Sequence, residues 1–597
     1  MCRIAGLADF KNSISHTQHQ VEQMCNLLIH GGPDDGGIFI AESCHLVLGN
    51  RRLSLLDLSS EGHMPMTYLN QYHITYNGEI YNYQQLKNEL IALGHQFSNK
   101  TDTEVILAAY AQWGVLAFSK LEGMFAFALF DAQSQELFLA RDAAGIKPLY
   151  YNINENGLGF ASEVRALASV SILNSQNNNW PIYMMAYGHL PEPITTSNDI
   201  KPLPKGFFLK YSFQNRQYHY QSFSHFSYSS AINDEETAKR NTKTVLSDAI
   251  ERQLLADAPI GVFLSGGLDS SIIASLASSF QKDKLNTLSI YFDEEAYSEK
   301  KYQDVLIQQL QCNHHQLLLK QVAFEEALPQ ILSAMDLPSC DGINTWFISK
   351  YAAENGLKAV LSGLGGDELY GGYPSFSRFN KAKWLQQLPD FIKTVGKNSS
   401  SKRLSRMSYL KLNGIKGIYL FLRGHFTPVD IARYLECDES EVWATLEAMP
   451  AIIDTEGIDD KNMASWMEFN LYMQNQLLRD SDVMSMNHGV EIRVPFLDDK
   501  NIRMANKISS EIKFSGKLPK QFLIDTFIDD IPQEIWNRPK MGFSFPFSQW
   551  LSESHYVEEV MLNGNQQSKN NYKKFMSGKL HWSQLMLLLL LNHRNIR

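Results

Sequence analysis

A glycine turn at residues 261–271 constrains this chain more than any other feature of its sequence. The segment reads Gly-Val-Phe-Leu-Ser-Gly-Gly-Leu-Asp-Ser-Ser, and its apolar first half predicts a buried strand. Backbone N–H groups of the Ser-Gly-Gly turn can close around an anion, at the positive end of the helix that Ser270 opens. We therefore expect a parallel sheet that binds a phosphate group beyond the end of one strand.

The spacing of this turn differs from that of a Walker A loop, and no Lys follows its glycines. A loop without that lysine suits the departing pyrophosphate of ATP better than a transferred γ-phosphoryl group. The predicted chemistry is adenylylation, in which ATP yields AMP and pyrophosphate while a carboxylate becomes an acyl-adenylate. The alternative that the turn alone leaves open is a Ser/Gly-rich connection that binds no ligand.

A cysteine at position 2 is the second informative feature. Because Cys is small enough to permit removal of the initiator Met, the mature chain is predicted to begin with a free α-amino group on Cys2. The unperturbed pKa of such an amine, about 8, lets it take the thiol proton near neutral pH. One residue then carries both nucleophile and base, as in enzymes with an N-terminal threonine nucleophile.

Together these two ends of the chain resemble the glutamine-dependent asparagine synthetases and their close amidotransferase relatives. The resemblance covers nearly the whole chain. In the first half it rests on Cys2 and on residues 30–37, 52–54, 77–82, 101–102, 123–127, 141–142 and 160–163. In the second half it rests on residues 265–271, 362–363, 365–368, 493–498 and 538–543.

The resemblance implies two domains and an α/β fold with an α+β N-terminal part. Residues 2–210 would form an N-terminal nucleophile αββα sandwich, the class II glutaminase domain. After a linker at 211–234, residues 235–597 would form a Rossmann-like, parallel-sheet ATP-pyrophosphatase domain with helical additions at its C-terminal end. The polarity pattern agrees, since the chain turns polar at 211–233 and apolar runs at 260–264, 285–291 and 359–361 then alternate with helical patterns.

Local patterns also predict individual elements. Apolar and aromatic runs predict strands at 124–130 and 135–140, and helical spacing predicts helices at 84–93, 103–112 and 235–255. Thr101 or Asp102 is the expected N-cap of the second of these helices. The apolar run 585–591 is too short to span a bilayer and is predicted to lie in a buried C-terminal helix.

The composition excludes several classes of function. With a net charge of −10 over 597 residues, the chain lacks the basic balance that nucleic-acid binding needs. Arg3 and Asp9 interrupt any apolar leader, and the six cysteines show no C-x-x-C spacing, so no signal peptide, disulfide framework or zinc site is expected. We predict a cytoplasmic protein without nucleic-acid or membrane partners. Its oligomeric state stays open, with a homodimer as one candidate.

By the resemblance, glutamine hydrolysis in the first domain needs binding residues besides the thiol. Asn77 and Gly78, expected in a tight turn, would donate hydrogen bonds to the oxyanion. Arg52 would bind the substrate carboxylate through its forked guanidinium, and Glu79 and Asp102 would accept hydrogen bonds from the substrate ammonium. Taken singly, the charged residues fit surface salt bridges equally well, and the Asn-Gly pair fits an ordinary hairpin turn.

The resemblance also implies a site for ATP and Mg²⁺ in the second domain. Asp269 and Asp367 are the predicted Mg²⁺ ligands, because this ion prefers hard carboxylate and phosphate oxygens. Lys540 would stabilise charge on the transferring phosphate, or alternatively it is an exposed loop lysine. The predicted ATP contacts are Leu264, Ser265, Gly266, Gly267, Asp269, Ser270, Ile290, Ser362 and Gly363.

Three positions depart from the family pattern. Gly31 stands where the family has Arg in a His-Arg-Gly-Pro-Asp loop, so we expect a missing contact or a less rigid loop there. Leu364 replaces a Glu that would take a proton from ammonium, and Val483 stands beside Asp482 where Arg is expected. Leu364 and Val483 are expected near the acceptor pocket, so they bear on the acceptor more than on the reaction.

The resulting prediction is a carbon–nitrogen ligase, a glutamine-dependent asparagine synthetase. It would hydrolyse glutamine to ammonia, adenylylate the aspartate side chain with ATP, and form asparagine, AMP and pyrophosphate. The first alternative is the same machinery acting on another carboxylate, such as a uronic-acid sugar or a secondary metabolite. Ring closure in the manner of β-lactam synthetases is disfavoured by the retained Cys2. A non-enzymatic scaffold is disfavoured by Asp269, Asp367 and Lys540.

Overall fold

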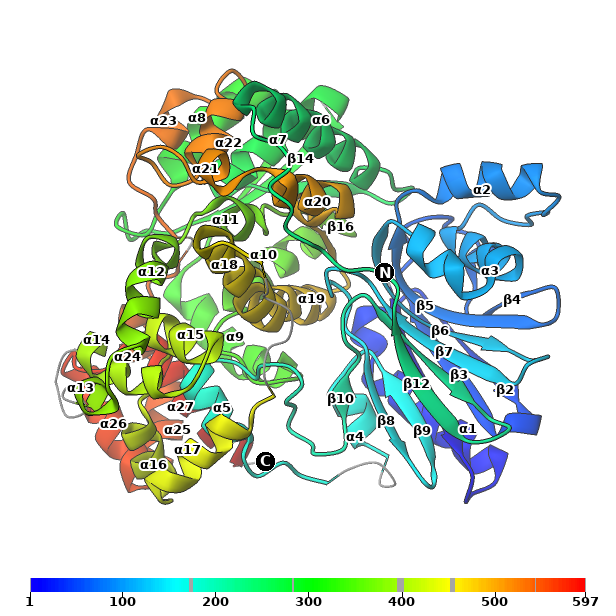
Figure 1. Cartoon of the computed structure of the whole chain (residues 1–597), viewed down its shortest axis with the longest axis horizontal. Helices are drawn as coiled ribbons and strands as arrows, with labels where there is room; N and C mark the ends of the chain where they lie inside the picture. The colour runs from blue at the N-terminus through cyan, green and yellow to red at the C-terminus, as the bar shows by residue number, and fades with distance from the viewer. Residues whose placement is uncertain are drawn as a thin grey trace.

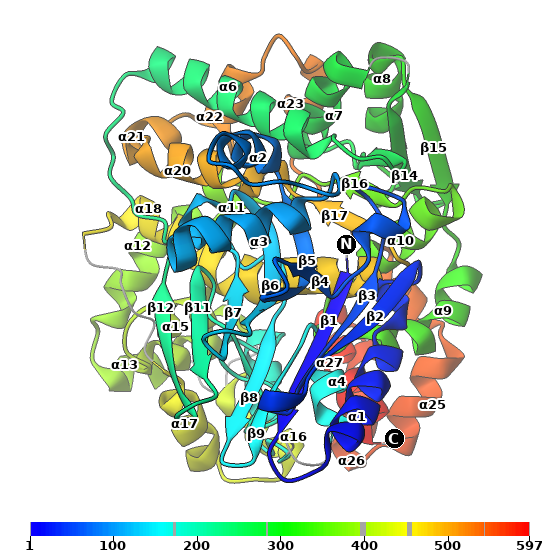
Figure 2. The ribbon, with the colours of Figure 1, turned by 90° about the vertical axis from the view of Figure 1, so that its right-hand side faces the viewer.

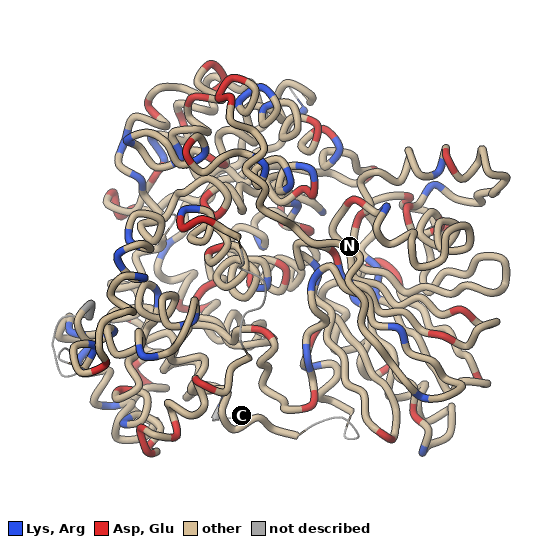
Figure 3. Tube along the Cα trace, in the orientation of Figure 1, with Lys and Arg blue, Asp and Glu red and all other residues tan. Residues whose placement is uncertain are grey.

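The computed structural model describes residues 2–170, 175–281, 284–394, 402–450, 457–542 and 544–595. Met1 and Phe543, which belong to the expected motifs, lie outside the described residues. The chain forms a strand-rich N-terminal half and a helix-rich C-terminal half that lie side by side (Figure 1). From the strand-rich side, the long antiparallel strands lie in front of the helices of the C-terminal half (Figure 2). Lys and Arg are interspersed with Asp and Glu over both halves (Figure 3).

The N-terminal half is built from two six-stranded sheets with antiparallel pairing. In spatial order, the first sheet contains β10 (Lys201–Pro202), β8 (Tyr150–Asn154), β9 (Gly157–Ala161), β1 (Cys2–Asp9), β3 (Leu46–Arg52) and β2 (Asp35–Ala41). The second contains β12 (Gln217–Ser222), β11 (Phe207–Ser212), β7 (Glu136–Arg141), β6 (Gly123–Asp131), β5 (Tyr72–Ile80) and β4 (Met66–Tyr68). Helices α1 (Ile14–Leu27) and α4 (Val164–Ala168) pack against the first sheet. Helix α3 (Asp102–Trp113) packs against the second, with α2 (Tyr83–Ala92) beside it.

The alternation of side chains along β1 explains why the sheets stack. Ile4 and Ala8 lie in the apolar core between the two sheets, together with Phe130 of β6. Ala5 and Leu7 point to the other face, where they join the core that includes α1. A strand that is apolar on both faces must be covered on both faces, and this produces the predicted αββα sandwich.

The C-terminal half contains a five-stranded sheet with parallel pairing. Its order is β15 (Asn313–Leu318), β14 (Asn286–Tyr291), β13 (Ile260–Phe263), β16 (Ala359–Leu361) and β17 (Glu491–Arg493). Strand β13 lies at its centre, followed at once by the glycine turn and by α7 (Leu268–Gln281). The predicted parallel sheet, with the turn at a strand end, is confirmed, and α7 begins before the expected Ser270.

Helices surround this sheet and extend beyond it. Besides α7, the helices between residues 235 and 467 are α6 (Glu235–Gln253), α8 (Lys300–Leu310), α9 (Gln321–Ala334), α10 (Ile343–Glu354), α11 (Gly366–Tyr370), α12 (Pro374–Gln386), α13 (Asp390–Thr394), α14 (Lys402–Ser405), α15 (Ile415–Arg423), α16 (Pro428–Leu435), α17 (Glu439–Ala448) and α18 (Asp460–Met467). A π-helix (Glu468–Leu478) leads into α19 (Arg479–Met486). The remaining helices are α20 (Asp499–Lys507), α21 (Ser510–Lys513), α22 (Gln521–Thr526), α23 (Gln533–Trp536), α24 (Phe547–Ser552), α25 (His555–Asn563), α26 (Gln566–Met576) and α27 (Trp582–Asn595), with α5 (Trp180–Tyr187) preceding β10.

Most local predictions agree with these elements. Thr101, and not Asp102, is the N-cap of α3, because its side chain accepts a hydrogen bond from Glu104 N. The run 585–591 is buried within α27, as predicted. Among the described residues, none of the helices has the length and apolar character needed to traverse a bilayer.

The segment predicted as a linker, residues 211–234, contains part of a strand pair. β11 ends at Ser212 and β12 ends at Ser222, so the second sheet extends past position 210. Irregular chain then leads to α6, and on the way Ile232 N donates to the carbonyl oxygen of Lys507 in the C-terminal half at 2.8 Å. The strands of the first half therefore end later than its predicted boundary.

Candidate functional site

Cys2, the predicted nucleophile, begins β1 and is buried beside β5. Its backbone N donates to Asn77 Oδ1 at 3.2 Å. This nitrogen becomes the α-amine if Met1 is removed, so amine, thiol and Asn77 are brought together. Burial raises the pKa of the Cys2 thiol, and the positive charge of Arg52 opposes that shift. A thiol of this kind needs an adjacent base, which the α-amine would supply.

Asn77 and Gly78 lie within β5 and pair with β6, so the expectation of a tight turn is wrong. In the described part of the chain, the buried Asn77 Nδ2 has no hydrogen-bond partner. Gly is required at position 78 because a Cβ there would lie 2.1 Å from the carbonyl oxygen of Met124. A buried donor without a partner is costly unless a ligand satisfies it, which is the property expected of an oxyanion-hole donor.

Arg52, the predicted partner of the substrate carboxylate, is held by the loop that follows β3. Its Nη1 donates to the Ser59 carbonyl at 2.9 Å and its Nη2 to the Leu56 carbonyl at 3.2 Å. Gly62 allows this packing, since a Cβ there would lie 1.9 Å from Nη2. Arg52 is 5% exposed, so the alternative of a surface salt bridge is wrong.

Asp102 and Glu79, the predicted partners of the substrate ammonium, are also buried. Asp102 accepts hydrogen bonds from the Tyr76 hydroxyl at 2.7 Å and from Ile80 N at 2.9 Å. Glu79 Oε1 lies 3.4 Å from Nη2 of Arg493, which belongs to β17 in the other half. Burial raises the pKa of Glu79 to about 8 despite Arg493, and it raises the pKa of Asp102. A bound ammonium would favour the charged form of both carboxyl groups.

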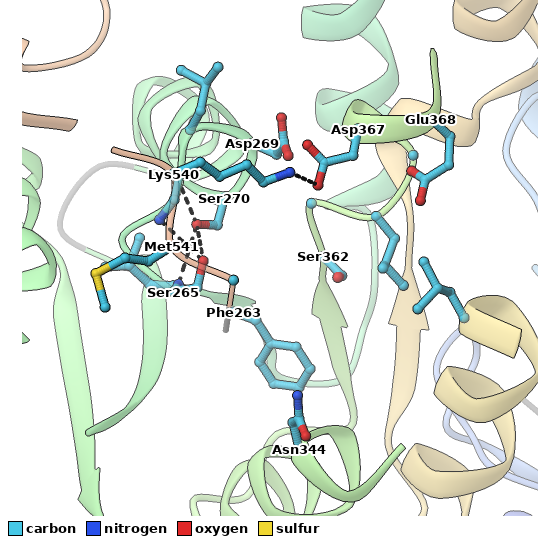
Figure 4. A pocket seen from close by; sticks show the side chains of 18 of the residues that line it. Phe263, Ser265, Asp269, Ser270, Asn344, Ser362, Asp367, Glu368, Lys540 and Met541 are labelled. Atoms are coloured by element: carbon cyan, nitrogen blue, oxygen red, sulfur yellow. Dashed lines mark hydrogen bonds and ion pairs between the residues drawn. The ribbon is translucent and has the colours of Figure 1, made fainter. Parts of the chain in front are cut away.

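The glycine turn borders a cavity of about 470 Å³ at the carboxyl ends of the parallel strands (Figure 4). Gly266 has φ 80°, which a residue with a side chain rarely adopts. The Ser265 hydroxyl lies 2.9 Å from the Ser270 hydroxyl and accepts from Gly267 N at 3.2 Å. Gly266 shapes this turn, and the other predicted ATP contacts line the cavity: Leu264, Ser265, Gly267, Asp269, Ser270, Ile290, Ser362 and Gly363.

Two lysines from the C-terminal part of the chain reach the carboxylates of this cavity. Lys520 Nζ lies 2.6 Å from Asp269 Oδ2 and 2.7 Å from Asp367 Oδ1. Lys540 Nζ lies 2.7 Å from Asp367 Oδ2, as Figure 4 shows. Its side chain is 37% exposed, as the alternative of an exposed loop lysine expects, but it is ion-paired. Sequence reasoning missed Lys520, because it stands outside the motifs and no local pattern marks it.

Asp269 and Asp367 fit Mg²⁺ only together with a nucleotide. No group of three or more His, Cys, Asp or Glu side chains that could hold a metal occurs among the described residues. Although burial opposes the shift, Lys520 and Lys540 lower the pKa of Asp367 to about 2. Asp269 Oδ1 is buried without a hydrogen-bond partner in the described structure. Because Mg²⁺ completes its shell with phosphate and water oxygens, this donor set suits a nucleotide-bound ion.

A second wall of the cavity is acidic. Leu364 lines the cavity, as do Asp341, Glu368 and Asp480. Burial raises the pKa of both Glu368 and Asp480 to about 7, and it raises the pKa of Asp341. Val483 is buried in α19, the helix that contributes Asp480 to this wall.

The positively charged side chains that line the cavity pair with residues outside the acidic wall. Among its described lining residues, the Lys and Arg side chains are Lys520, Arg538 and Lys540. The two lysines pair with the carboxylates beside the glycine turn, and Arg538 lies 2.7 Å from Glu299. The acidic wall therefore has no partner of opposite charge among these lining residues.

The fold and the two sites define a two-part amidotransferase, with the cysteine at position 2 in a sheet sandwich and a glycine turn on a parallel sheet. The model of the family described as asparagine synthase matches residues 241–579, and that of the glutamine amidotransferase domain matches residues 1–223. The chain belongs to the asparagine synthase family.

Proteins with different names are similar to this chain. "Asparagine synthetase [glutamine-hydrolyzing] 1" of Bacillus subtilis is 30% identical over 594 residues, which cover 96% of this chain and 91% of the relative. "Amidase chry2" of Gibberella zeae is 25% identical over 590 residues, which cover 89% of this chain and 85% of that protein. A solved glutamine phosphoribosylpyrophosphate amidotransferase of B. subtilis covers 61% of this chain and 81% of its own length, with 14% identity and a TM-score of 0.29.

Proposed function

We propose that this protein is a glutamine-dependent asparagine synthetase, which uses ATP and Mg²⁺ and releases AMP and pyrophosphate. The observation that carries the proposal is the pairing of Lys520 and Lys540 with Asp367 beside the glycine turn. This arrangement offers a departing pyrophosphate two cations, the backbone N–H groups of the turn and the start of α7. The residue ranges 2–210 and 235–597 would be its glutaminase and synthetase domains.

The glutaminase step would use residues around Cys2. The α-amine takes the thiol proton, and the thiolate attacks the amide carbon of glutamine. Asn77 Nδ2, with Gly78 N–H as the second predicted donor, would stabilise the oxyanion. The amine then protonates the leaving nitrogen, ammonia departs, and water hydrolyses the thioester to glutamate. Arg52 would bind the substrate carboxylate throughout.

The synthetase step would use the cavity. An oxygen of the acceptor carboxylate attacks the α-phosphorus of ATP, and pyrophosphate leaves toward Lys520 and Lys540. Asp269 and Asp367 would hold Mg²⁺, which neutralises phosphate charge when bound. Ammonia then attacks the acyl carbon, and AMP leaves. Glu368 and Asp480 are the carboxylates on the acidic wall suited to take the surplus proton, because burial raises the pKa of each to about 7 and Leu364 cannot act as a base.

The identity of the acceptor is the part of this proposal that most needs a test. Aspartate is the leading candidate, since a relative that aligns with 96% of this chain bears the name asparagine synthetase. The second candidate is a carboxylate whose remainder is uncharged, such as a uronic-acid sugar, whose hydroxyl groups can donate hydrogen bonds to Asp341, Glu368 and Asp480. Aspartate brings an ammonium group, which the acidic wall attracts, as well as a second carboxylate, which it repels.

Product analysis distinguishes these candidates. The enzyme is incubated with ATP, Mg²⁺ and amide-¹⁵N glutamine, first with aspartate alone and then with a panel of uronic acids. We expect AMP, pyrophosphate and one ¹⁵N-labelled amide, identified by mass. Labelled asparagine supports aspartate, and a labelled uronamide supports the second candidate. Release of ADP and inorganic phosphate in place of AMP would refute the adenylylation mechanism.

Cytoplasmic location and a homodimer also remain predictions. Cell fractionation tests the first, and light scattering of the purified protein tests the second. A membrane-bound fraction or a monomer would contradict them.

A further inference from the structure

Arg3 follows the nucleophile but points to the opposite face of β1. It is fully buried, on the same face as Ala5 and Leu7. Its Nη1 lies 2.6 Å from Oδ2 of Asp482, which belongs to α19 in the C-terminal half. Its Nε lies 3.1 Å from Glu163 Oε1. One guanidinium thus joins a carboxylate of its own half to a carboxylate of the other half.

The side chain of Arg3 explains why position 31 is glycine. A Cβ on Gly31 would lie 2.7 Å from Arg3 Cγ and 2.8 Å from Arg3 Nε. A larger residue at position 31 would displace the arginine. The family pattern has its arginine in the loop at this position, whereas here a guanidinium reaches the same space from β1. Arg3 fills the space beside Gly31, and the expectation of a missing contact or a less rigid loop there stays a prediction.

Among the described residues, the cations that pair with Asp482 come from the N-terminal half. Arg3 is one, and Lys147, whose Nζ lies 3.5 Å from Asp482 Oδ1, is the other. Val483, where the family pattern has arginine, contributes an apolar side chain that is buried. The negative charge of Asp482 on α19 is therefore balanced by cations of the other half.

Among the described residues, three buried ion pairs cross between the halves next to the two sites: Arg3–Asp482, Lys147–Asp482 and Glu79–Arg493. On the glutaminase side, Arg3 directly follows Cys2. On the cavity side, Asp482 and Arg493 directly follow two lining residues, Ser481 and Ile492. Removing one member of a buried ion pair leaves an uncompensated charge, so these contacts resist separation of the halves.

We propose that Arg3 is a positioning residue that couples the two sites, and this inference rests on the proposed function. Its ion pair with Asp482 holds the strand that bears Cys2 against the helix that lines the cavity. Ammonia released at the thiol then meets a closed interface and reaches the acceptor site instead of the solvent. Gly31 is the permissive partner, because it leaves room for the arginine.

The test measures glutamate formed per ATP consumed at saturating glutamine, with the acceptor found by product analysis. For Arg3→Met we expect this ratio to rise about fivefold or more, the lower end of typical coupling between sites. Synthesis supported by free ammonium should be retained, since ammonium does not depend on Cys2. Arg3→Lys should rescue part of the coupling. Arg3→Ala combined with Gly31→Arg should restore it, because the loop then supplies the guanidinium.

Two further variants keep the test decisive. Asp482→Asn breaks the same ion pair from the other half and should raise the ratio in the same way, even if Arg3→Met fails to fold. Lys210→Met removes a cation from an ion pair inside the second sheet, 2.6 Å from Glu136, and should leave the ratio unchanged. An unchanged ratio in a folded Arg3→Met or Asp482→Asn protein overturns the inference, as does a parallel loss of glutamine- and ammonium-supported synthesis. Release of ADP would overturn the proposed function alone, because the ratio is counted per ATP consumed.

Discussion

Asn77→Ala tests the glutaminase site most directly, because the two ends of this side chain have different partners. Oδ1 accepts a hydrogen bond from Cys2 N at 3.2 Å. Nδ2 is buried and has no hydrogen-bond partner within the described residues. Truncation therefore removes one hydrogen bond from the folded protein and one donor that is available to the reacting oxygen. We expect catalysis to suffer much more than stability.

The two effects differ in size. Loss of one oxyanion-hole donor lowers kcat about 10²–10³-fold, which corresponds to about 2.7–4 kcal/mol of transition-state stabilisation. Loss of one internal hydrogen bond lowers the free energy of unfolding by about 0.5–1.5 kcal/mol. A variant that stays folded at room temperature should thus lose nearly all glutamate release.

The assay follows three quantities on one preparation: glutamate release at saturating glutamine, AMP formation with ammonium, and urea unfolding. Asn77→Asp keeps an acceptor oxygen near Cys2 but removes the donor, so its kcat should fall as far. Asn50→Ala is the matched control, because Asn50 Nδ2 is satisfied by Thr75 Oγ1 at 3.1 Å. That variant should lose stability and keep most glutamate release.

The reasoning fails if folded Asn77→Ala loses less than about tenfold in kcat, since no oxyanion donor would then have been removed. Equal loss of ammonium-supported AMP formation would also refute it, because that reaction bypasses the thiol.

Three other predictions follow from the two sites. Cys2→Ala should abolish glutamine-supported amide formation and leave ammonium-supported synthesis, and similar losses of both would contradict separate sites. Lys520→Met should lower pyrophosphate release by about 10²-fold or more while glutamate release persists, since a preorganised charge is lost only at the cavity; unchanged pyrophosphate release would exclude Lys520 from the phosphate site. Folding raises the pKa of Glu368 from 4.5 to about 7, so the folded state holds this proton more tightly. The resulting contribution to the free energy of unfolding is complete below pH 4.5 and is lost as the pH rises to about 7, a change of roughly 3 kcal/mol. Urea unfolding of the Glu368→Gln variant should not show this pH-dependent change.

Local patterns in the sequence were sufficient for much of the fold. Apolar runs located β13, β14 and β16, because a strand buried on both faces needs a continuous apolar segment. The glycine turn was recognisable from its residue types, because the backbone at Gly266 has φ 80°, which glycine adopts more readily than other residues. The position of Cys2 next to the initiator Met marked it as a candidate nucleophile, and the resemblance to a known family then supplied Asn77, which no periodicity marks.

The tertiary structure determined which side chains distant in sequence lie in contact. The sequence by itself indicated a turn at Asn77, whereas pairing with β6 makes this segment a strand and leaves Nδ2 without a partner. Lys520 joins Asp269 and Asp367 from a segment without any motif. Arg3 reaches Asp482 over most of the chain length. Secondary structure follows from the spacing of neighbouring residues along the chain. Contacts between side chains that are distant in sequence depend on how sheets and helices pack, and only the folded chain sets that packing.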